Sequence, residues 1–430
     1  MTGQGRLKSI ALACSCGFAL AGGPAGASGF TAPDPGIKAM GLAGAFTAQA
    51  SDPTASFYNP GGLALLKKGK LTAGLAAEYL NESQFQGATP GLGAGQTGQQ
   101  KKTYTLLPHL YAVKPLGDKL KLGIAVYTPY AFKTEWDDPG TFAGRDLATR
   151  GQLQSYDVNT NLSWKVTPSL GFGAGVIYRS ARFSMGRRLS GANPNTGETQ
   201  DVGSFALDTD WDYGLGWDAG FLHKIGQGFA WGVTYRSPIK IDFAGAGRLT
   251  QVSTGDAQID ALNRASLPYD TNLRIGTSID FPQTATLGVG FALGPKLWVE
   301  TDVTQTGWSR FKGLNVFFPS NPAFNQTLQG AWDDTLSYRL GAQLKMGKGM
   351  VLRLGYAFED TPQPDASLAL SPIFPDAKRS VFSAGFGRDW LDIGFQFIAP
   401  AIRTATTGRS TDLNGTYKGN TYLLGISITK

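Results

Sequence analysis

The feature that most constrains this chain is a two-residue alternation of apolar side chains with small or polar ones, which recurs from about residue 71 to the C-terminus. In residues 120–127, leucine, isoleucine and valine take every second position, and lysine, glycine, alanine and tyrosine stand between them. Successive side chains of a strand point to opposite faces, so each such stretch predicts a strand with one apolar face. The same pattern occupies residues 170–179, 229–236, 336–341, 391–397 and 422–428.

The links between these predicted strands alternate between short and long. Short links occupy residues 115–118, 165–168, 224–227, 294–295, 346–348 and 387–389. Long links occupy residues 81–102, 131–151, 184–210, 244–279, 311–332, 360–377 and 400–418. An even set of about 14 strands with short turns at one end and long loops at the other is typical of an outer-membrane barrel. A soluble sandwich would fit the alternation alone, but it has no reason for this asymmetry.

The predicted fold is therefore all-β, a 14-stranded antiparallel transmembrane β-barrel in the outer membrane of a Gram-negative cell. Lipid offers no hydrogen bonds to an open sheet edge, so the sheet has to close. Aromatic residues near strand ends are candidates for the interfacial girdles. They are Tyr104, Tyr111, Tyr130, Tyr178, Tyr235, Trp298, Tyr356, Trp390 and Tyr422.

A barrel of this size encloses a lumen too wide for strand side chains to fill. The chain has 58 glycines, many at predicted inward positions, which makes still more room. Residues 36–66 are rich in small side chains, lack the alternation and end on Asn59-Pro60-Gly61-Gly62. We expect residues 28–69 to fill the lumen as an N-terminal hatch and residues 70–430 to form the barrel. We therefore favour a barrel blocked by a hatch over a general porin with an open channel.

The first 27 residues read as a signal peptide. Arg6 and Lys8 precede a moderately apolar stretch over residues 10–21, and Ala25-Gly26-Ala27 offers a small-x-small cleavage pattern. The apolar stretch is too short for a membrane anchor. A lipid-attachment site at Cys14 is the other alternative, although little apolar sequence precedes it. Both cysteines, Cys14 and Cys16, fall in this leader, so the remaining chain has no thiol chemistry.

Neither composition nor motifs indicate an enzyme, a metal site or a nucleic-acid partner. The net charge of +7 includes Arg6 and Lys8, which leaves +5 (7 − 2), spread along the chain without a Lys/Arg run. The two histidines, His109 and His223, lie in predicted strands without other ligands at metal-binding spacing. We expect no cofactor, no metal and no catalytic residues.

Several stretches together resemble the FadL-type outer-membrane transporters of long-chain fatty acids and other hydrophobic compounds. The most specific is the predicted hatch, in which Gly41-Leu42-Ala43-Gly44-Ala45 leads through Asp52 to Phe57-Tyr58-Asn59-Pro60-Gly61-Gly62-Leu63. Others begin at Leu107-Pro108, Tyr127-Thr128-Pro129-Tyr130, Thr234-Tyr235-Arg236-Ser237-Pro238 and Thr306-Gly307-Trp308. Two features depart from the family's pattern. Gly61 replaces the usual alanine, which we expect to loosen the hatch turn, and the chain does not end on an aromatic residue.

The resemblance implies a path for the ligand. A hydrophobic groove among the long loops takes up a fatty acid or similar compound, a tighter internal site receives it, and the ligand leaves laterally beside a kinked third strand. Pro129 is the candidate for this gate, because proline cannot donate to a strand ladder; a plain strand-end proline is the alternative. The implied hatch residues are Gly41, Gly44, Asp52, Asn59, Pro60 and Gly61. The implied partners are a hydrophobic small molecule and outer-membrane lipid, for a chain that acts as a monomer.

Inward charges are the candidates for holding a carboxylate head group by charge-assisted hydrogen bonds. They are Arg236, Arg179, Arg339, Arg353 and Lys121, with Arg236 preferred, and Glu300, Asp302 and Asp392 share the inward face. A structural network between barrel wall and hatch is the alternative reading of the same residues. Passive uptake is the expected function, with a structural or adhesive surface barrel, a general porin and a barrel enzyme as competing hypotheses.

Overall fold

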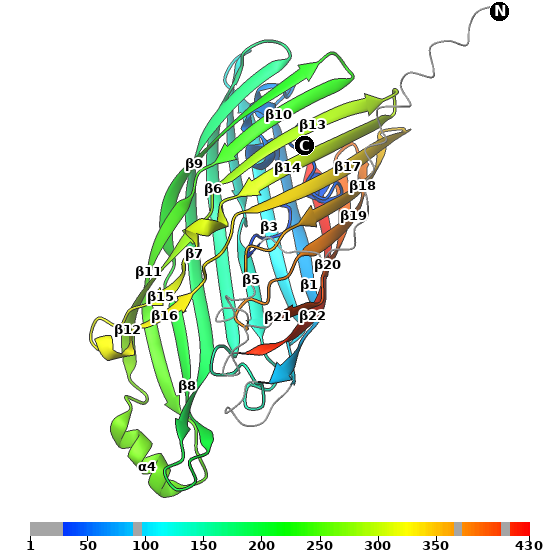
Figure 1. The fold of residues 1–430 in the computed structure, drawn as a ribbon. Coiled ribbons are helices and arrows are strands. Elements are labelled where there is room, and N and C mark those ends of the chain that lie inside the picture. The colour runs from blue at the N-terminus through cyan, green and yellow to red at the C-terminus, as the bar shows by residue number, and fades with distance from the viewer. Residues whose placement is uncertain (1–28, 89–96, 365–371, 406–412) are drawn as a thin grey trace, which may run out of the picture.

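The computed structural model describes residues 29–88, 97–364, 372–405 and 413–430 (Figure 1). The predicted signal peptide, residues 1–27, lies outside the described residues. The described chain is a closed sheet with the N-terminal segment, residues 29–69, inside it. No helix in the described ranges is long and apolar enough to cross a membrane.

Four positions in the wall are each made by two consecutive strands, so the closed antiparallel sheet is a barrel of 14 strands, as predicted. The sheet closes where β1 pairs with both β3 and β22. The undivided strands are β1 (Lys70–Ala88), β3 (Thr103–Pro115), β6 (Arg150–Lys165), β7 (Leu170–Ala192), β14 (Leu297–Thr306), β17 (Thr335–Gly347), β18 (Met350–Glu359), β19 (Arg379–Arg388), β20 (Leu391–Pro400) and β22 (Asn414–Thr429). The divided ones are β4 (Leu120–Tyr127) with β5 (Ala131–Glu135), β8 (Thr199–Thr209) with β9 (Asp212–Ile225), β10 (Phe229–Arg236) with β11 (Ile239–Gln251), and β12 (Asn272–Phe281) with β13 (Thr284–Leu293).

The alternation maps onto the two faces of the wall. On β6, Leu162 and Trp164 are each 50% exposed on the outside, whereas Asn161 and Ser163 are fully buried on the inside. The same division runs around the barrel, which leaves a belt of exposed apolar side chains on its outer surface. This belt is the surface that lipid covers.

Several predicted loops are more ordered than the sequence indicated. Strands β1 and β7 run on to Ala88 and Ala192, and β8 forms a hairpin with β7 well beyond the belt. The link after β11 carries α4 (Ala257–Ser266), and the link after β14 carries the hairpin of β15 (Gly313–Val316) and β16 (Gln326–Gln329). Short strands β2 (Thr97–Gln99) and β21 (Arg403–Ala405) extend the sheet at the same end. In Figure 1 these elements form the end of the barrel that carries α4.

The N-terminal segment packs against the inner wall through α1 (Ile37–Met40), α2 (Ala55–Tyr58) and α3 (Pro60–Ala64). Inward glycines give it room, because a Cβ at Gly355 or Gly173 would lie within 2.5 Å of its backbone atoms. Its helices touch opposite sectors of the barrel, α1 against β19, β20 and β22, and α3 against β6, β7 and β9. The lumen therefore holds a docked segment rather than an open channel.

Three of the aromatic residues predicted for the girdles do not belong to them. Trp298 shares the inward face of β14 with Glu300 and donates to its carboxylate at 3.1 Å. Tyr111 and Tyr130 are 0% and 4% exposed and lie inside the barrel. Tyr104, at 73% exposed, and Trp390, at 53%, do lie on the outer surface. A single aromatic residue near a strand end does not reveal its face, because it suits the core as well as the interface.

Candidate functional site

Two acidic side chains of β14 hold the middle of the N-terminal segment. The Asp302 carboxylate accepts hydrogen bonds from the backbone N–H groups of Phe46 and Thr47, at 3.1 and 3.0 Å. The Glu300 carboxylate accepts from the N–H groups of Ala48 and Gln49, at 2.6 and 3.2 Å. Four successive amides thus end on two buried acids, which fixes this turn against the wall.

Asn59 caps α3 and joins it to the wall. Its side-chain Oδ1 accepts from the N–H of Gly61 at 3.0 Å, while Nδ2 donates to the carbonyls of Thr47 at 3.0 Å and Phe221 at 2.8 Å. Pro60 takes the first helical position, where its missing N–H costs nothing. The Asn59 side chain therefore uses both of its Nδ2 hydrogens and its Oδ1 oxygen inside the lumen.

The expectation that Gly61 loosens the turn is wrong. A Cβ at Gly61 would lie 2.7 Å from the carbonyl oxygen of Gly171, 2.8 Å from that of Gly220 and 2.9 Å from the N of Leu222. These are backbone atoms of β7 and β9, so they cannot move aside without disturbing the sheet. Glycine at this position permits close contact between α3 and the wall.

The remaining predicted hatch residues also make local packing contacts. Asp52 accepts hydrogen bonds from the backbone N–H and the hydroxyl of Thr54, at 2.8 and 2.5 Å, and lies 3.7 Å from the Lys38 ammonium. Gly41 faces Gly385 of β19 so closely that its Cβ would lie 2.9 Å from that Cα. Gly44 has a positive φ of 78°, which favours glycine.

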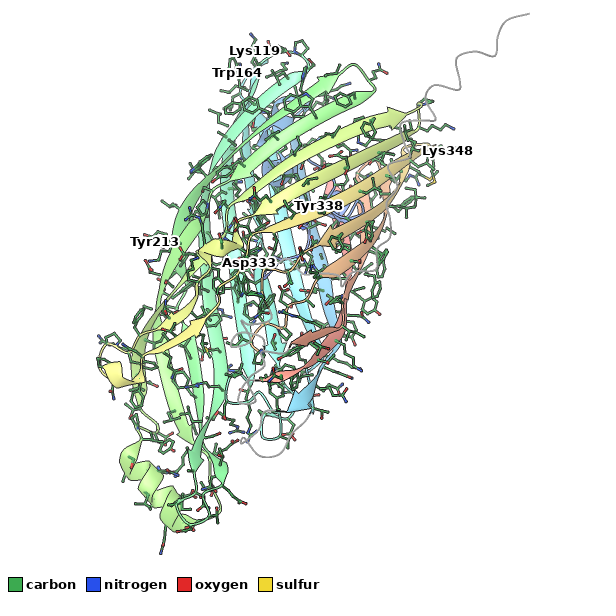
Figure 2. All side chains as sticks on the ribbon, in the orientation of Figure 1. Lys119, Trp164, Tyr213, Asp333, Tyr338 and Lys348 are labelled. Atoms are coloured by element: carbon green, nitrogen blue, oxygen red, sulfur yellow. The ribbon has the colours of Figure 1, made fainter. Side chains whose placement is uncertain are left out.

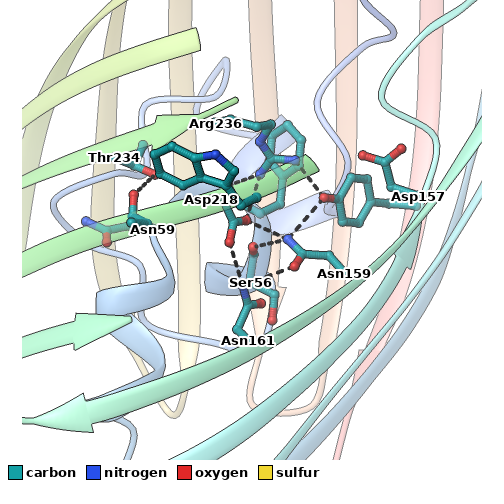
Figure 3. A network of polar contacts seen from close by, with 12 residues as sticks. Ser56, Asn59, Asp157, Asn159, Asn161, Asp218, Thr234 and Arg236 are labelled. Atoms are coloured by element: carbon teal, nitrogen blue, oxygen red, sulfur yellow. Dashed lines mark hydrogen bonds and ion pairs between the residues drawn. The ribbon is translucent and has the colours of Figure 1, made fainter. Parts of the chain in front are cut away.

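Arg236, the preferred head-group candidate, lies in a dense polar network between the wall and α2 (Figure 3). Its guanidinium donates to the Tyr127 hydroxyl at 2.6 Å and to the Phe57 carbonyl at 2.8 Å, and lies 3.7 Å from the Asp218 carboxylate. It also stacks over the Phe57 ring, 4.3 Å from its centroid. These contacts match the structural-network alternative more closely than an unoccupied anion site.

The same network includes two asparagines of β6. Asn159 donates to the Asp218 carboxylate at 2.6 Å and to the Ser56 carbonyl at 3.2 Å, and Asn161 donates to the other Asp218 oxygen at 2.9 Å (Figure 3). Asp218 thus connects β6, β9 and β10, and the backbone of α2 is held from two of these strands.

The other basic candidates are separated rather than gathered at one site. Arg179 makes a bidentate pair with Asp157, at 2.8 Å for both contacts, and Arg353 contacts Asp392 at 2.6 Å. Lys121 donates to the backbone carbonyls of Ala64 and Leu66 at the end of α3. Each of these cations is thus held by the wall or by the N-terminal segment.

Arg339 differs from the other candidates. One guanidinium nitrogen contacts Glu359 at 2.5 Å, but the buried Nη1 has no hydrogen-bond partner among the described residues. It lines a cavity of about 120 Å³ that also reaches Asp34, Thr47 and Tyr58. Of the five basic candidates, Arg339 is the one with a spare buried donor.

The barrel wall is interrupted at the predicted gate. Strand β4 ends at Tyr127 and β5 begins at Ala131, and β5 pairs with β6 but not with β3. Strand β3 pairs with β4 only over residues 110–115, so residues 103–109 have no ladder partner on that side. A cavity of about 30 Å³ lies at this break, lined by Leu106, Leu107, Thr128, Phe132 and Tyr156 among others. Pro129 lies within the break.

The start of the N-terminal segment covers this break from inside. Thr31 bridges to Tyr130, the N–H of Ala32 donates to the Pro129 carbonyl at 2.9 Å, and the N–H of Ala131 donates to the Phe30 carbonyl at 3.2 Å. The backbone of residues 129–131 is therefore satisfied by residues 30–32 and by the Ser155 hydroxyl, which bonds to both backbone groups of Tyr130, and not by β3.

Phe30 occupies an aromatic cage beside the break. Its ring centroid lies 4.6 Å from that of Trp308, 5.4 Å from Phe311 and 5.6 Å from Trp332. Four more rings complete the cage: Tyr130, Phe132, Phe281 and Phe374. The residual cavity around Phe30 exposes no polar surface, which suits an apolar ligand. No local pattern marks Phe30 in the sequence, so sequence reasoning missed it.

A second apolar cavity, of about 280 Å³, lies among the outer elements. Strands β8 and β11, the segment after α4, and the β15–β16 hairpin contribute its lining. Its apolar members are Leu189, Val202, Phe205, Leu249, Leu267, Leu273, Phe318 and Phe324. Among the described residues, the links at the opposite end of the barrel are short turns, whereas those at this end are long enough to build such a groove.

Burial shifts the pKa of Asp376, an acid in a loop. Asp376 lies between β18 and β19, and its carboxyl accepts a hydrogen bond from the Thr361 hydroxyl at 2.5 Å. Burial raises the pKa of Asp376 to about 7, against the lowering effects of that hydrogen bond and of Arg379 and Arg403. Ile373 of the same loop packs in the cluster that contains the cage, and Phe374 is one of the cage rings, so Asp376 lies close in the chain to the cage.

Within the part of the chain that the structure describes, no three metal-type ligands lie close enough to hold an ion. A membrane barrel with an internal docked segment, apolar cavities at two depths and an interrupted wall defines the class of outer-membrane transport proteins. The protein is accordingly an outer-membrane barrel.

Comparison with known proteins identifies the family. Residues 18–430 match the family of outer membrane protein transport proteins described as OMPP1/FadL/TodX, and the chain belongs to it. The long-chain fatty acid transport protein of Salmonella typhi is 25% identical over 315 residues, which cover 68% of this chain and 69% of that one. This is a family of transport channels, not of enzymes.

Solved structures show the same fold. A FadL homologue of Pseudomonas aeruginosa has 21% identity and a TM-score of 0.82, with 94% of this chain and 99% of that chain covered. The toluene transporter TodX of Pseudomonas putida has 16% identity and a TM-score of 0.70, with 94% and 98% covered. The Salmonella relative is named for long-chain fatty acids and TodX for toluene, so membership of the family does not by itself select a ligand.

Proposed function

We propose that the protein takes up long-chain fatty acids or similar hydrophobic compounds passively, with residues 28–69 as a hatch and with lateral exit through the wall. The observation that carries the proposal is the break between β3 and β5, which is covered from inside by residues 30–32. The name of the Salmonella relative and the aromatic cage around Phe30 support a hydrophobic ligand.

The path has three steps. The ligand first enters the outer cavity between β8, β11 and the β15–β16 hairpin. It then takes the place of the Phe30 ring in the aromatic cage, which removes residues 30–32 from the break. Burial of each methylene contributes about 0.8 kcal/mol, so a long alkyl chain can offset the loss of one phenylalanine side chain from the cage.

Exit follows once the backbone of Pro129 and Ala131 loses its partners in the N-terminal segment. The ligand then passes between β3 and β5 toward the lipid belt, while the rest of the hatch stays docked through Glu300, Asp302 and Asn59. Bulk water and polar solutes remain excluded throughout. No energy source is needed, because the ligand moves from water to apolar sites.

Arg339 is the better candidate for a carboxylate head group than Arg236. Its Nη1 is buried and free of partners among the described residues, whereas the donors of Arg236 contact Tyr127 and Phe57. The cavity that Arg339 lines also borders Thr31, which lies next to Phe30. An acid held there would have its chain directed toward the aromatic cage.

Uptake of labelled oleate and of labelled toluene by cells with and without the gene tests the function. Expression should accelerate uptake of at least one of the two, without raising permeability to a small hydrophilic antibiotic. Uptake of neither compound, or a general rise in permeability, would contradict the proposal. Arg339→Met separates the ligands, because it should slow the acid and spare toluene.

A further inference from the structure

The end of the barrel with short turns is strongly cationic. Ten Lys and Arg side chains in and beside these turns are exposed, against two exposed acids, Asp118 and Asp389, for a net charge of +8 (10 − 2). The ten are Lys67, Lys68, Lys70, Lys114, Lys119, Lys296, Lys345, Lys348, Arg388 and Lys430. We call them the cationic rim. Lys119 and Lys348, labelled in Figure 2, lie at this end. The chain carries these charges singly and in pairs, and the fold brings them together.

The rim cations are unpaired. None of the ten forms an ion pair with any residue in the described ranges, although Lys and Arg elsewhere do so repeatedly. At the loop end, five cations have acidic partners, although others there, such as Lys312, form no ion pair among the described residues. The pairs are Lys101–Glu135, Arg150–Asp208, Lys240–Asp242, Arg248–Asp270 and Lys378–Asp360. Among the described residues the two ends therefore differ in charge balance, because exposed acids are common at the loop end and rare beside the short turns.

The rim borders the apolar belt. Exposed apolar residues lie next to rim cations along the chain. Leu71 is 47% exposed and follows Lys70, Met346 is 45% exposed and follows Lys345, and Trp390 is 53% exposed and lies two residues after Arg388. Long cationic side chains can lay their stems on apolar surface and place their charge at the headgroup level. Tryptophan prefers the same level. The cationic groups thus lie where the lipid headgroups of the surrounding leaflet begin.

We propose that the cationic rim binds the phosphate groups of anionic phospholipids in the leaflet around the short turns. The rim is spread over four of the short turns, β3–β4, β13–β14, β17–β18 and β19–β20, and over the start of β1 and the end of β22, so it covers most of the circumference rather than one sector. A ring of this shape fits an annulus of lipid, whereas a docked protein would cover a sector. The mouth inside the ring is already filled by α3 and residues 65–69.

Titration of the detergent-solubilised barrel with fluorescent phosphatidylglycerol tests the proposal, with phosphatidylcholine as the neutral comparison. The rim variant removes four charges: Lys114→Gln, Lys119→Gln, Lys345→Gln and Lys348→Gln. The matched control removes four from the loop end: Lys101→Gln, Lys240→Gln, Lys312→Gln and Lys378→Gln. The native barrel should bind the anionic lipid more tightly, and salt should weaken this binding.

The rim variant should lose about tenfold or more in phosphatidylglycerol affinity, since each cation near a membrane surface contributes up to about fivefold. Its phosphatidylcholine binding and its heat-modifiable gel migration should not change, and the control variant should bind as the native protein does. Equal loss in both variants would mean that only net charge matters and would overturn the proposal. Unchanged affinity in the rim variant would overturn it as well and would leave an acidic protein as the partner.

Discussion

Replacing Arg236 by methionine tests whether this buried cation holds the N-terminal segment in the lumen. The substitution keeps most of the side-chain volume but removes the hydrogen bonds to Tyr127 and Phe57, at 2.6 and 2.8 Å, and leaves Asp218 without its cation. Breaking a buried pair on one side costs about 3–5 kcal/mol. Asn159 and Asn161 still contact Asp218, so the lower end, about 3 kcal/mol, applies.

Because Arg236 contacts the backbone of α2, most of this cost falls on docking of the segment. A loss of about 3 kcal/mol raises the undocked fraction roughly 100-fold. Arg236→Met cells should therefore become sensitive to small hydrophilic antibiotics, and the barrel should keep its heat-modifiable migration. The exposed Arg248→Met is the matched control and should have no effect. Loss of fatty-acid uptake without any rise in antibiotic sensitivity would refute the reasoning and return Arg236 to the ligand site.

Three further substitutions test separate parts of the path. Gly61→Ala should lower the thermal midpoint of the barrel by an amount equivalent to about 1–3 kcal/mol, because the added Cβ would meet backbone atoms of β7 and β9. The control Gly228→Ala should leave the midpoint unchanged, because nothing lies within 4 Å of its Cβ, and equal shifts in the two variants would contradict this reasoning. Phe30→Ala should speed oleate uptake, since its ring no longer competes for the cage; slower uptake would contradict competition. Burial raises the pKa of Asp376 from 3.8 to about 7, so the folded loop is increasingly destabilised as pH rises through this range. The loop around Asp376 should therefore become more sensitive to proteinase K over the same range, and Asp376→Asn should abolish this pH dependence.

The transmembrane part of the fold was predictable because lipid imposes a period of two on every strand. Outside the belt that constraint ends, so sequence reasoning placed the outer parts of β1 and β7 in loops. Strand β8 alternates between polar and apolar residues only weakly, and its pairing with β7 depends on tertiary contacts. The inward position of glycines was predictable, since a docked segment needs room at those positions.

The candidate site was only partly predictable. The sequence indicated which charges face inward, but the Tyr127 and Phe57 partners of Arg236 lie 109 and 179 residues away in the chain. Its Asp218 partner and the Asp157 partner of Arg179 lie directly opposite on the neighbouring hairpin strand. Pro129 marked the place where the ladder stops. It carried no signal that residues 30–32, about 100 positions earlier, supply the missing hydrogen bonds, because such pairing depends on long-range register.

The most direct test of the central claim is a reversible lock between the N-terminal segment and the break. Thr31 and Tyr130 are opposite each other in an antiparallel bridge, and the flanking hydrogen bonds make them a non-hydrogen-bonded pair with close Cα atoms. This geometry suits a disulfide. Outside the leader the chain has no cysteine, so Thr31→Cys with Tyr130→Cys would form a single defined bond.

Oleate uptake by cells carrying this double variant should be blocked when the disulfide is oxidised and restored when it is reduced. Gel mobility with and without reductant would report how completely the bond has formed. Equal uptake in the two states, with the disulfide fully formed, would contradict a path that requires residues 30–32 to leave the wall.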